Sequence, residues 1–535
     1  MATTIPDIRT EFRNQPNTDF SDPANRRAME EAIEKVRGQF DRTWPLVIGG
    51  ERIGDRGAEP STSPHDPKLV VGKVAQANEK DADRALQAAA DAFESWKNVS
   101  YEERAEYLFR AAEVMIERRF ELNAWLSFEV SKSWVEADVE VSELIDFATY
   151  YAHQMLRLGG RHPMQPYPGE TNELEYLPLG VCAVIPPWNF AGAIMGGMTM
   201  AAIVAGNTVV LKPASTSPVI AAVFADILIN DCGLPAGVLN FLPGPGGKIG
   251  DFIVDDPRTR LIAFTGSKEV GMRIYERAAK VHKGQRWLKR TVLEMGGKDG
   301  LIVDETADLD ESADAIVRSA FGFQGQKCSA CSRAIVVDEV YDEVLNKVIE
   351  RTRQLTVGDP TDGETFMGAV IDAKSHRKIA EYIDIGKKEG RLAYGGRTDV
   401  GSGHHIEPTI IADVPEDGRI AQEEIFGPVL AFIRARDFDH AIEIINNTEF
   451  GLTGGLMSGS KERLERAKRD IHVGNLYLNR KITGALVGVQ PFGGFNMSGT
   501  DSKAGGPDYL LLFTQAKSIT NRLSGDADSG PDGEM

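Results

Sequence analysis

The chain has 535 residues, enough for two or more domains with substantial cores, and its 42% hydrophobic and 26% charged residues are typical of a soluble protein. The net charge of −19 disfavours nucleic acid and anionic membrane surfaces as partners. No apolar stretch reaches the roughly 18 residues of a membrane span, residues 1–20 do not resemble a signal peptide, and four cysteines make no disulfide framework, so a cytoplasmic location is expected.

The amphipathic patterns predict helices at 24–40, 80–96 and 101–123, and a broken helix at 131–158. Apolar runs at 181–186, 208–212, 238–242, 261–264, 291–294 and 300–303 then read as strands alternating with helices at 191–204, 216–231, 246–254 and 268–280. A second series has strands near 334–338, 428–433, 452–457 and 474–478 between helices near 339–355, 373–388, 437–446 and 459–470. This alternation predicts two parallel-sheet α/β domains joined near 290–300, followed by a disordered tail at 523–535.

The loop 322–333 contains Cys328 among Gly, Gln, Lys and Ser, a setting unusually polar for a core thiol. Basic and amide neighbours predict a thiolate, which is the reactive form of cysteine. Glu294 ends an apolar run upstream, so a nucleophile and a base for covalent chemistry on a carbonyl are both present. Cys328 and Cys331 also form a C-x-x-C pair, which leaves a redox pair or half a zinc site open as alternatives. Scattered histidines disfavour a metal, and Cys182 and Cys232 read as inert core residues.

Four further segments each allow a functional and a structural interpretation. The turn after the strand at 261–264 could hold a phosphate at a helix N-terminus or serve only as a turn. Lys212 could reach a ribose or phosphate at the carboxyl edge of a parallel sheet, or lie solvated in a loop. Asn189 could donate to an oxyanion or simply form a turn. Glu424 could bind a ribose diol and Phe426 could pack on a flat ring, or the two could be a helix-end carboxylate and a core aromatic.

Several short motifs occur in one order along the chain: Pro187–Phe190, Lys212–Ala214, Phe264–Ser267, Glu294–Lys298, Gly325–Cys328, Glu424–Pro428 and Pro491–Gly494. Together they resemble the aldehyde dehydrogenase superfamily over roughly residues 45–520. Within it, the segments 322–333 and 475–488, and Phe12-Arg13-Asn14 near the N-terminus, resemble the L-glutamate γ-semialdehyde dehydrogenases. The resemblance implies NAD-dependent oxidation of glutamate semialdehyde to glutamate, the last step of proline catabolism.

The resemblance also implies an aldehyde dehydrogenase-like fold with an oligomerisation element. Its parts are expected to be an N-terminal helical extension at 1–44, an NAD-binding Rossmann-like domain at 45–158 and 179–292, a catalytic domain at 293–489, and a β-hairpin oligomerisation element at 159–178 and 490–522. At least a homodimer is expected, with this element pairing across subunits. A transient contact with proline dehydrogenase is also expected.

The resemblance assigns roles to individual residues. Cys328 is expected to form a thiohemiacetal and then a thioester, Asn189 to hold the oxyanion, and Glu294 to act as general base, with Lys212 as a further catalytic residue. The residues expected at the cofactor are Ile185, Pro186, Trp188, Lys212, Ser215, Gly246, Thr265, Gly266, Ser267, Glu424 and Phe426. Those expected at the substrate are Glu143, Phe190, Lys327, Ser329, Gly484, Ala485 and Phe492; no metal is expected.

Two points stay open. Ser215 stands where many NAD-specific relatives have Glu, so some use of NADP is expected. Other hypotheses are a dehydrogenase of another aldehyde such as succinate semialdehyde, an inactive scaffold that keeps the fold, and a thiol–disulfide protein that uses Cys328 and Cys331. A site with groups for both an amine and a carboxylate favours glutamate semialdehyde over the amine-free aldehyde.

Overall fold

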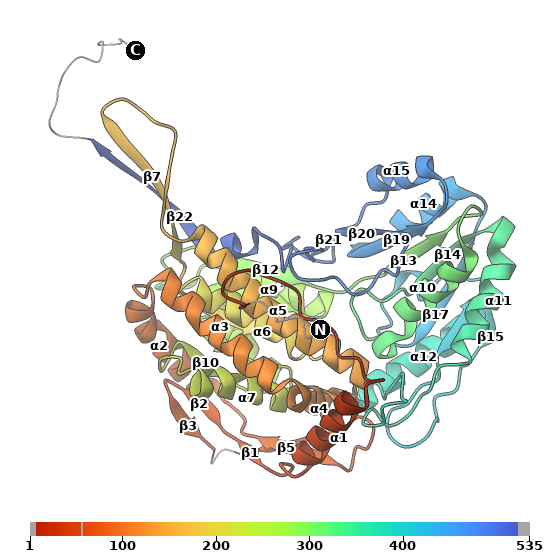
Figure 1. The fold of residues 1–535 in the computed structure, drawn as a ribbon, viewed down its shortest axis with the longest axis horizontal. Coiled ribbons are helices and arrows are strands. Elements are labelled where there is room, and N and C mark those ends of the chain that lie inside the picture. Colours follow the sequence, from red (N-terminus) through yellow and green to blue (C-terminus); the bar gives the residue numbers. More distant parts are fainter. Residues whose placement is uncertain (1–6, 55–56, 523–535) are drawn as a thin grey trace.

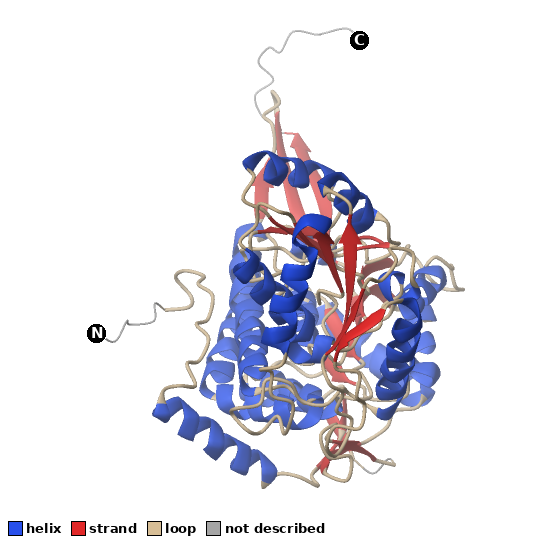
Figure 2. Cartoon of the chain, turned by 90° about the vertical axis from the view of Figure 1, so that its right-hand side faces the viewer, coloured by secondary structure: helices blue, strands red, loops and turns tan. Residues whose placement is uncertain are grey.

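The protein is described by a computed structural model covering residues 7–54 and 57–522. Two α/β domains lie side by side and a thin β-sheet arm projects from the first of them (Figure 1). Helices pack on both sides of the sheets, and the strands of the arm extend beyond them (Figure 2). The predicted tail at 523–535 lies outside the described residues.

The first domain is built on a seven-stranded sheet of order β12-β11-β8-β9-β10-β2-β3, in which the strands from β12 to β10 are parallel. Helices α2, α8 and α9 contact one face, while α6 and α7 contact the other, with α3, α4 and α5 outside them. The strands are β2 Leu46–Ile48, β3 Glu51–Ile53, β8 Val181–Ile185, β9 Thr208–Leu211, β10 Leu239–Phe241, β11 Thr259–Thr265 and β12 Arg290–Glu294. The helices are α1 Pro23–Arg37, α2 Glu79–Trp96, α3 Tyr101–Glu117, α4 Arg119–Val130, α5 Trp134–Leu158, α6 Ala193–Val204, α7 Pro218–Asp226, α8 Asp251–Asp255 and α9 Lys268–Ala278.

The second domain has a seven-stranded sheet of order β15-β16-β17-β14-β13-β19-β20, in which only β15 runs antiparallel. Helices α10 and α11 cover one face, and α12 and α14 the other. The strands are β13 Gly300–Val303, β14 Arg333–Val337, β15 Arg391–Tyr394, β16 Thr409–Ala412, β17 Val429–Ala435, β19 Thr453–Met457 and β20 Asn475–Leu478. The helices are α10 Leu309–Phe321, α11 Tyr341–Thr352, α12 Ala373–Glu389, α13 Arg419–Gln422, α14 Phe438–Asn446 and α15 Lys461–Asp470.

The apolar runs of the sequence are explained by burial on both faces of these sheets. Leu301 and Val303 of β13 pack into the core under α10 and α11, whereas Ile302 packs into the core under α12 and α14. Because successive side chains of a strand point to opposite faces, a strand covered on both sides must be apolar throughout.

The arm is a three-stranded antiparallel sheet of order β22-β7-β6. Its strands are β6 Arg161–Pro163, β7 Glu170–Pro178 and β22 Thr514–Arg522. The hairpin predicted at 159–178 is therefore present, and the C-terminal strand pairs with it inside the same chain. Smaller sheets are formed by β1 Thr43–Trp44, β4 Glu59–Thr62 and β5 Val70–Val74, and by β18 Phe450–Gly451 with β21 Phe495–Asn496.

The prediction of two α/β domains is confirmed, with two local corrections. Residues 300–303, the last of the first series of apolar runs, form β13 inside the second sheet, within the range 293–489 expected for the second domain. The predicted break within 131–158 is absent from α5, which contains neither Gly nor Pro; the chain breaks instead at Ser131, with φ 60°. The predicted helix 101–123 is divided at Arg118.

A buried ion pair joins the first domain to the loop that carries Cys328. Lys132 lies between α4 and α5, and its Nζ is 2.6 Å from Glu140 Oε2, with both side chains inaccessible to solvent. The other Glu140 oxygen accepts the N–H groups of Gly192 (2.6 Å) and Ala193 (3.2 Å) at the start of α6. The same Lys132 Nζ lies 4.0 Å from the centre of the Phe190 ring and 4.1 Å from that of Phe323. One ammonium group therefore holds two aromatic rings from different domains.

Candidate active site

The loop after α10 places Cys328 at the boundary of the two domains. Phe323, Gln324 and Gly325 all have positive φ, at 49°, 57° and 65°. A Cβ on Gly325 would lie 2.3 Å from the carbonyl oxygen of Gly427, so only glycine fits there. This left-handed turn brings the loop back across the end of the sheet and exposes the Cys328 side chain to the cavity between the domains.

The amide and basic side chains around Cys328 hold the loop in place. The Gln324 Nε2 group donates to the carbonyl oxygens of Ser131 and Ala369, each at 2.9 Å. Gln326 Oε1 accepts the N–H of Ile371 at 2.9 Å. The two glutamine side chains near the thiol thus bind backbone groups of other segments.

The prediction that these neighbours keep Cys328 as a thiolate is wrong. Burial raises the pKa of the thiol well above its usual value, and the carboxylates of Asp299 and Glu294 add to this effect. The Lys327 ammonium lies 2.6 Å from a carboxylate oxygen of Glu136. Cys328 is therefore a protonated thiol here, whereas the reactive form of cysteine is the thiolate.

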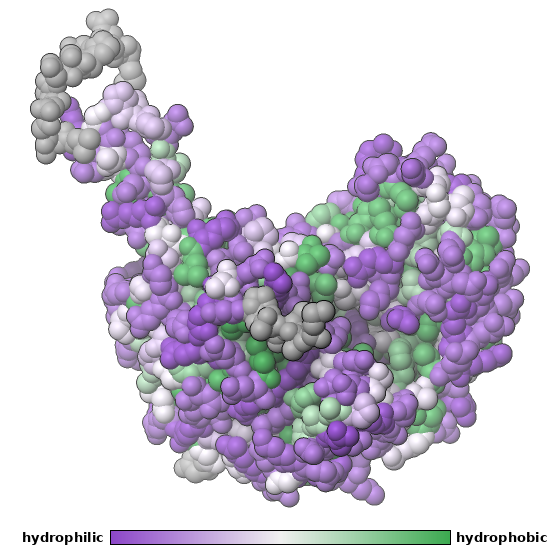
Figure 3. Space-filling model, viewed as in Figure 1, coloured by the Kyte–Doolittle hydropathy of each residue, from purple (hydrophilic) through white to green (hydrophobic). Residues whose placement is uncertain are grey.

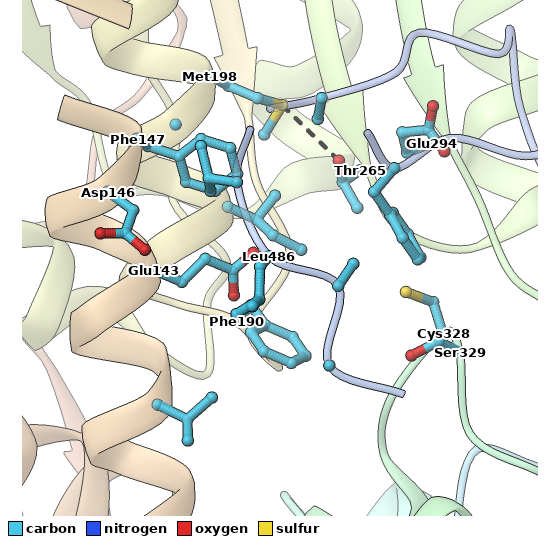
Figure 4. A pocket seen from close by; sticks show the side chains of 18 of the residues that line it. Glu143, Asp146, Phe147, Phe190, Met198, Thr265, Glu294, Cys328, Ser329 and Leu486 are labelled. Carbon is cyan, nitrogen blue, oxygen red and sulfur yellow. Dashed lines mark hydrogen bonds between the residues drawn. The ribbon is translucent and has the colours of Figure 1, made fainter. Parts of the chain in front are cut away.

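The cavity brings together residues that are far apart in the sequence. It is hollowed between the two domains on a mainly hydrophilic face (Figure 3), and the Cys328 sulfur and the Glu143 carboxylate lie on opposite sides of it (Figure 4). Every residue predicted at the substrate lines it, together with both the predicted nucleophile and the predicted base: Glu143, Phe190, Lys327, Ser329, Gly484, Ala485, Phe492, Cys328 and Glu294.

Glu294 is held at the end of β12 as a carboxyl group that titrates near neutrality. Its Oε1 accepts the hydroxyl of Ser502 at 2.5 Å, and its Oε2 accepts the N–H of Gly494 at 3.3 Å. Burial raises the pKa of Glu294 to about 7, against the opposing effect of these hydrogen bonds. A carboxyl group with this pKa can exchange a proton with water at neutral pH.

Glu143 is the carboxyl group on the opposite wall. Burial raises its pKa to about 8, and the nearby carboxylate of Glu140 adds to the increase. The charges of Lys132 and Lys327 oppose this increase but do not cancel it, so Glu143 is largely protonated at neutral pH. A cationic group brought into the cavity would favour its charged form.

Asn189 and Cys331 occupy distinct positions beside the nucleophile. Asn189 Nδ2 donates to the carbonyl oxygen of Gln326 at 3.0 Å, which places this amide next to the Cys328 loop. Its second N–H stays available for another acceptor. Cys331 is buried, its sulfur donates to the Arg333 carbonyl oxygen at 3.5 Å, and burial raises the pKa of its thiol to about 12.

The predicted cofactor residues lie at the carboxyl ends of the parallel strands of the first sheet. From β8 the chain adds β9 and β10 on one side of the sheet and then β11 and β12 on the other, so β8 and β11 are neighbours at a topological switch point. Dinucleotides bind at such switch points. Thr265, Gly266 and Ser267 follow β11, and Ser267 caps α9 by accepting the N–H of Val270. The residues that follow or end the adjacent strands are Ile185, Pro186, Trp188, Lys212 and Ser215.

Several groups at this edge can bind parts of a dinucleotide. Lys212 is buried, its Nζ donates to the Pro213 carbonyl oxygen at 2.9 Å, and burial lowers its pKa to about 8. Gly246 lies beside it, since a Cβ there would be 3.7 Å from Lys212 Cε, and a Cβ on Gly247 would meet nothing within 4 Å. The open glycine turn, the lysine and the start of α9 fit the ribose and phosphates of such a ligand.

Glu424 and Phe426 lie on the other side of Cys328, where they line a smaller cavity with it. Glu424 Oε1 accepts the N–H of Gly297 at 3.0 Å, and its carboxylate leaves no room for a Cβ on Gly296. The Phe426 backbone has a φ of 60°, and the centre of its ring lies 5.5 Å from the centre of the Trp188 ring. Phe426 thus contacts Trp188, one of the residues predicted at the cofactor, while lining the same small cavity as Cys328.

Several side chains at or near the site were not predicted from the sequence. Asp299 accepts the N–H of Thr453 at 2.7 Å, and burial raises its pKa to about 8; its position just after the Glu294–Lys298 motif was the available signal. Lys132 and Ser502 carried no local signal, because their partners are distant in the sequence.

Among residues 7–54 and 57–522, no helix is both long and apolar enough to cross a membrane, and no cluster of three or more potential ligands could hold a metal ion.

Comparison with known proteins agrees with this geometry. The model of the aldehyde dehydrogenase family matches residues 54–519. A 1-pyrroline-5-carboxylate dehydrogenase from Geobacillus sp. (strain WCH70) is 57% identical over 95% of this chain and 99% of its own. The crystal structure of 1-pyrroline-5-carboxylate dehydrogenase from Thermus with bound NAD has a TM-score of 0.94 at 50% identity, covering 96% of this chain and 99% of that one.

A longer protein also contains this fold. Proline utilization A from Bdellovibrio bacteriovorus matches with a TM-score of 0.95 at 43% identity, over 97% of this chain but only 54% of that protein. The order of the motifs, the two sheets and the cysteine between them therefore have one explanation: the chain belongs to the aldehyde dehydrogenase family.

Proposed function

We propose that this enzyme oxidises L-glutamate 5-semialdehyde, which forms from 1-pyrroline-5-carboxylate, to L-glutamate in proline catabolism, with NAD as the oxidant. The observation that carries the proposal is the cavity with Cys328 on one wall and Glu143 on the other. The N–H groups of the loop at Gly484 and Ala485, with Ser329 and Lys327, can take the substrate carboxylate, and Glu143 can take its ammonium group. Succinate semialdehyde has no amine to meet Glu143 and would leave that buried carboxyl group without a partner.

The residues of the chain can perform each proton transfer and addition. Cys328 releases its thiol proton to solvent and forms a C–S bond to the aldehyde carbon. The oxyanion accepts hydrogen bonds from the free N–H of Asn189 and from the Cys328 backbone. NAD, when bound, supplies the acceptor for the hydride that leaves this carbon. Glu294 then takes a proton from the water that hydrolyses the thioester, which releases the carboxylate product and restores the thiol.

The two cysteines of the C-x-x-C pair provide the direct test of the chemistry. We expect Cys328→Ser to lower kcat for NAD reduction with pyrroline-5-carboxylate by about 10³-fold or more, because the alkoxide is far less accessible than the thiolate. Cys331→Ser, at a buried thiol three positions away, should keep kcat within about threefold and is the matched control. Equal losses in both variants would contradict the proposal and favour a thiol–disulfide function.

Glu294 predicts how activity depends on pH. Its pKa is raised to about 7, so the base is protonated and inactive below that pH, and kcat should rise as pH increases through about 7. In Glu294→Gln, we expect kcat to fall by about 10²-fold or more, and the limb near pH 7 to disappear. If kcat of the Glu294→Gln variant still rose with pH with a midpoint near 7, the titrating group would be another residue.

A serine at position 215 leads us to expect some use of NADP. The side chain is exposed, close in the chain to Lys212, and carries no charge to repel a 2′-phosphate. We expect the wild type to reduce NADP measurably, and Ser215→Glu to lower kcat/KM for NADP by about tenfold while NAD changes by less than about threefold. Initial rates with both cofactors measure this, and an undetectable NADP rate in the wild type would contradict it.

We propose that the arm pairs two copies of the chain. Strands β6 and β22 form the edges of its sheet, and exposed edges pair readily with another chain. Light scattering should give a mass at least twice the 58.4 kDa of one chain, whereas a monomer at micromolar concentration would contradict the pairing. The transient contact with proline dehydrogenase and the cytoplasmic location stay predictions.

A further inference from the structure

The N-terminal segment 7–22 has no part in the mechanism above, although it reaches the cavity. It crosses the first domain before α1 begins, as the dark red chain in front of α5 in Figure 1. Gln15 and Asn17 line the cavity together with Glu143 and Asp146. The segment is therefore part of the wall on the side opposite Cys328.

One side chain of this segment connects two walls of the cavity. Asn14 Nδ2 donates to Asp146 Oδ2 and to the Val487 carbonyl oxygen, each at 2.9 Å. The backbone N–H of Gln15 donates to the second oxygen of Asp146 at 2.8 Å. Asp146 is the third residue after Glu143 on α5, so both lie on one helix face. Val487 follows Gly484 and Ala485 in the loop that faces the substrate carboxylate.

The segment is fixed by contacts that do not depend on Asn14. The Phe12 and Tyr150 rings meet edge to face with centres 4.9 Å apart, and a Cβ on Gly488 would lie 2.9 Å from Phe12. Thr18 donates to Asp138 through its N–H (2.7 Å) and its hydroxyl (2.8 Å). Removal of the Asn14 side chain should therefore leave the segment in place.

We infer that Asn14 is a positioning residue for substrate specificity. It sets the separation between the Glu143 wall, which meets the ammonium group, and the loop 484–487, which meets the carboxylate. An α-amino aldehyde needs both groups at a fixed spacing, whereas an aldehyde without the amine does not. The inference rests on the proposed function, because it concerns how that site recognises its substrate.

The test compares two aldehydes in three variants of the full chain. Asn14→Ala removes the bridge, Asn14→Leu keeps a side chain of similar size but loses the donor, and Arg13→Ala is the control at an exposed neighbour that pairs with Glu11. The substrates are glutamate semialdehyde and an unbranched aldehyde without the amine. With both Asn14 variants we expect KM for glutamate semialdehyde to rise about tenfold with kcat within about twofold, and kcat/KM for the amine-free aldehyde to stay unchanged. Arg13→Ala should change neither.

Several results would overturn the inference. Equal changes for both aldehydes would show a purely structural role, and unchanged kinetics would show none. Melting temperatures accompany the kinetics, and loss of folding in both Asn14 variants would likewise contradict a role in specificity. The proposed function is tested separately with the wild type, and a preference of the wild type for the amine-free aldehyde would contradict it. If the wild type prefers glutamate semialdehyde and the Asn14 variants keep that preference, only the inference about Asn14 is wrong.

Discussion

The Lys132–Glu140 ion pair is the contact on which the arrangement of the site depends. It has no access to solvent, and loss of one partner of such a pair costs about 3–5 kcal/mol because the other charge stays buried. Glu140 fixes the start of α6, and Lys132 lies between the rings of Phe190 and Phe323. The pair thus sets the substrate wall and the nucleophile loop relative to each other, across the boundary between domains.

Around this pair the site is rich in buried carboxyl groups. Burial raises the pKa of Glu294 to about 7 and those of Glu143 and Asp299 to about 8, so all three can change protonation near neutrality. The same burial disfavours the thiolate of Cys328. A cationic group close to these side chains would favour the thiolate and the carboxylates over their protonated forms.

Both the fold class and most of the site could be predicted because their signals are local. Strands buried on both faces are apolar throughout, and the Gly, Pro and Cys motifs stand at the ends of those strands. The error of consequence concerns environment. In the sequence Lys327 and Gln326 look available to the Cys328 sulfur, but in the fold they bind Glu136 and the backbone of Ile371.

The sequence by itself was enough to predict the two α/β domains, Cys328 and Glu294 as nucleophile and base, and a set of substrate residues that all line one cavity. Most of these residues lie in short motifs, and Glu143 came from the resemblance to the family. Only the tertiary structure decided which groups surround them. Lys132 meets Phe323, Ser502 meets Glu294, and Asn14 meets both Asp146 and Val487. These partners come from separate elements, and no local pattern encodes such a pairing. The pKa values follow from the same burial, which exists only after the two domains have packed together.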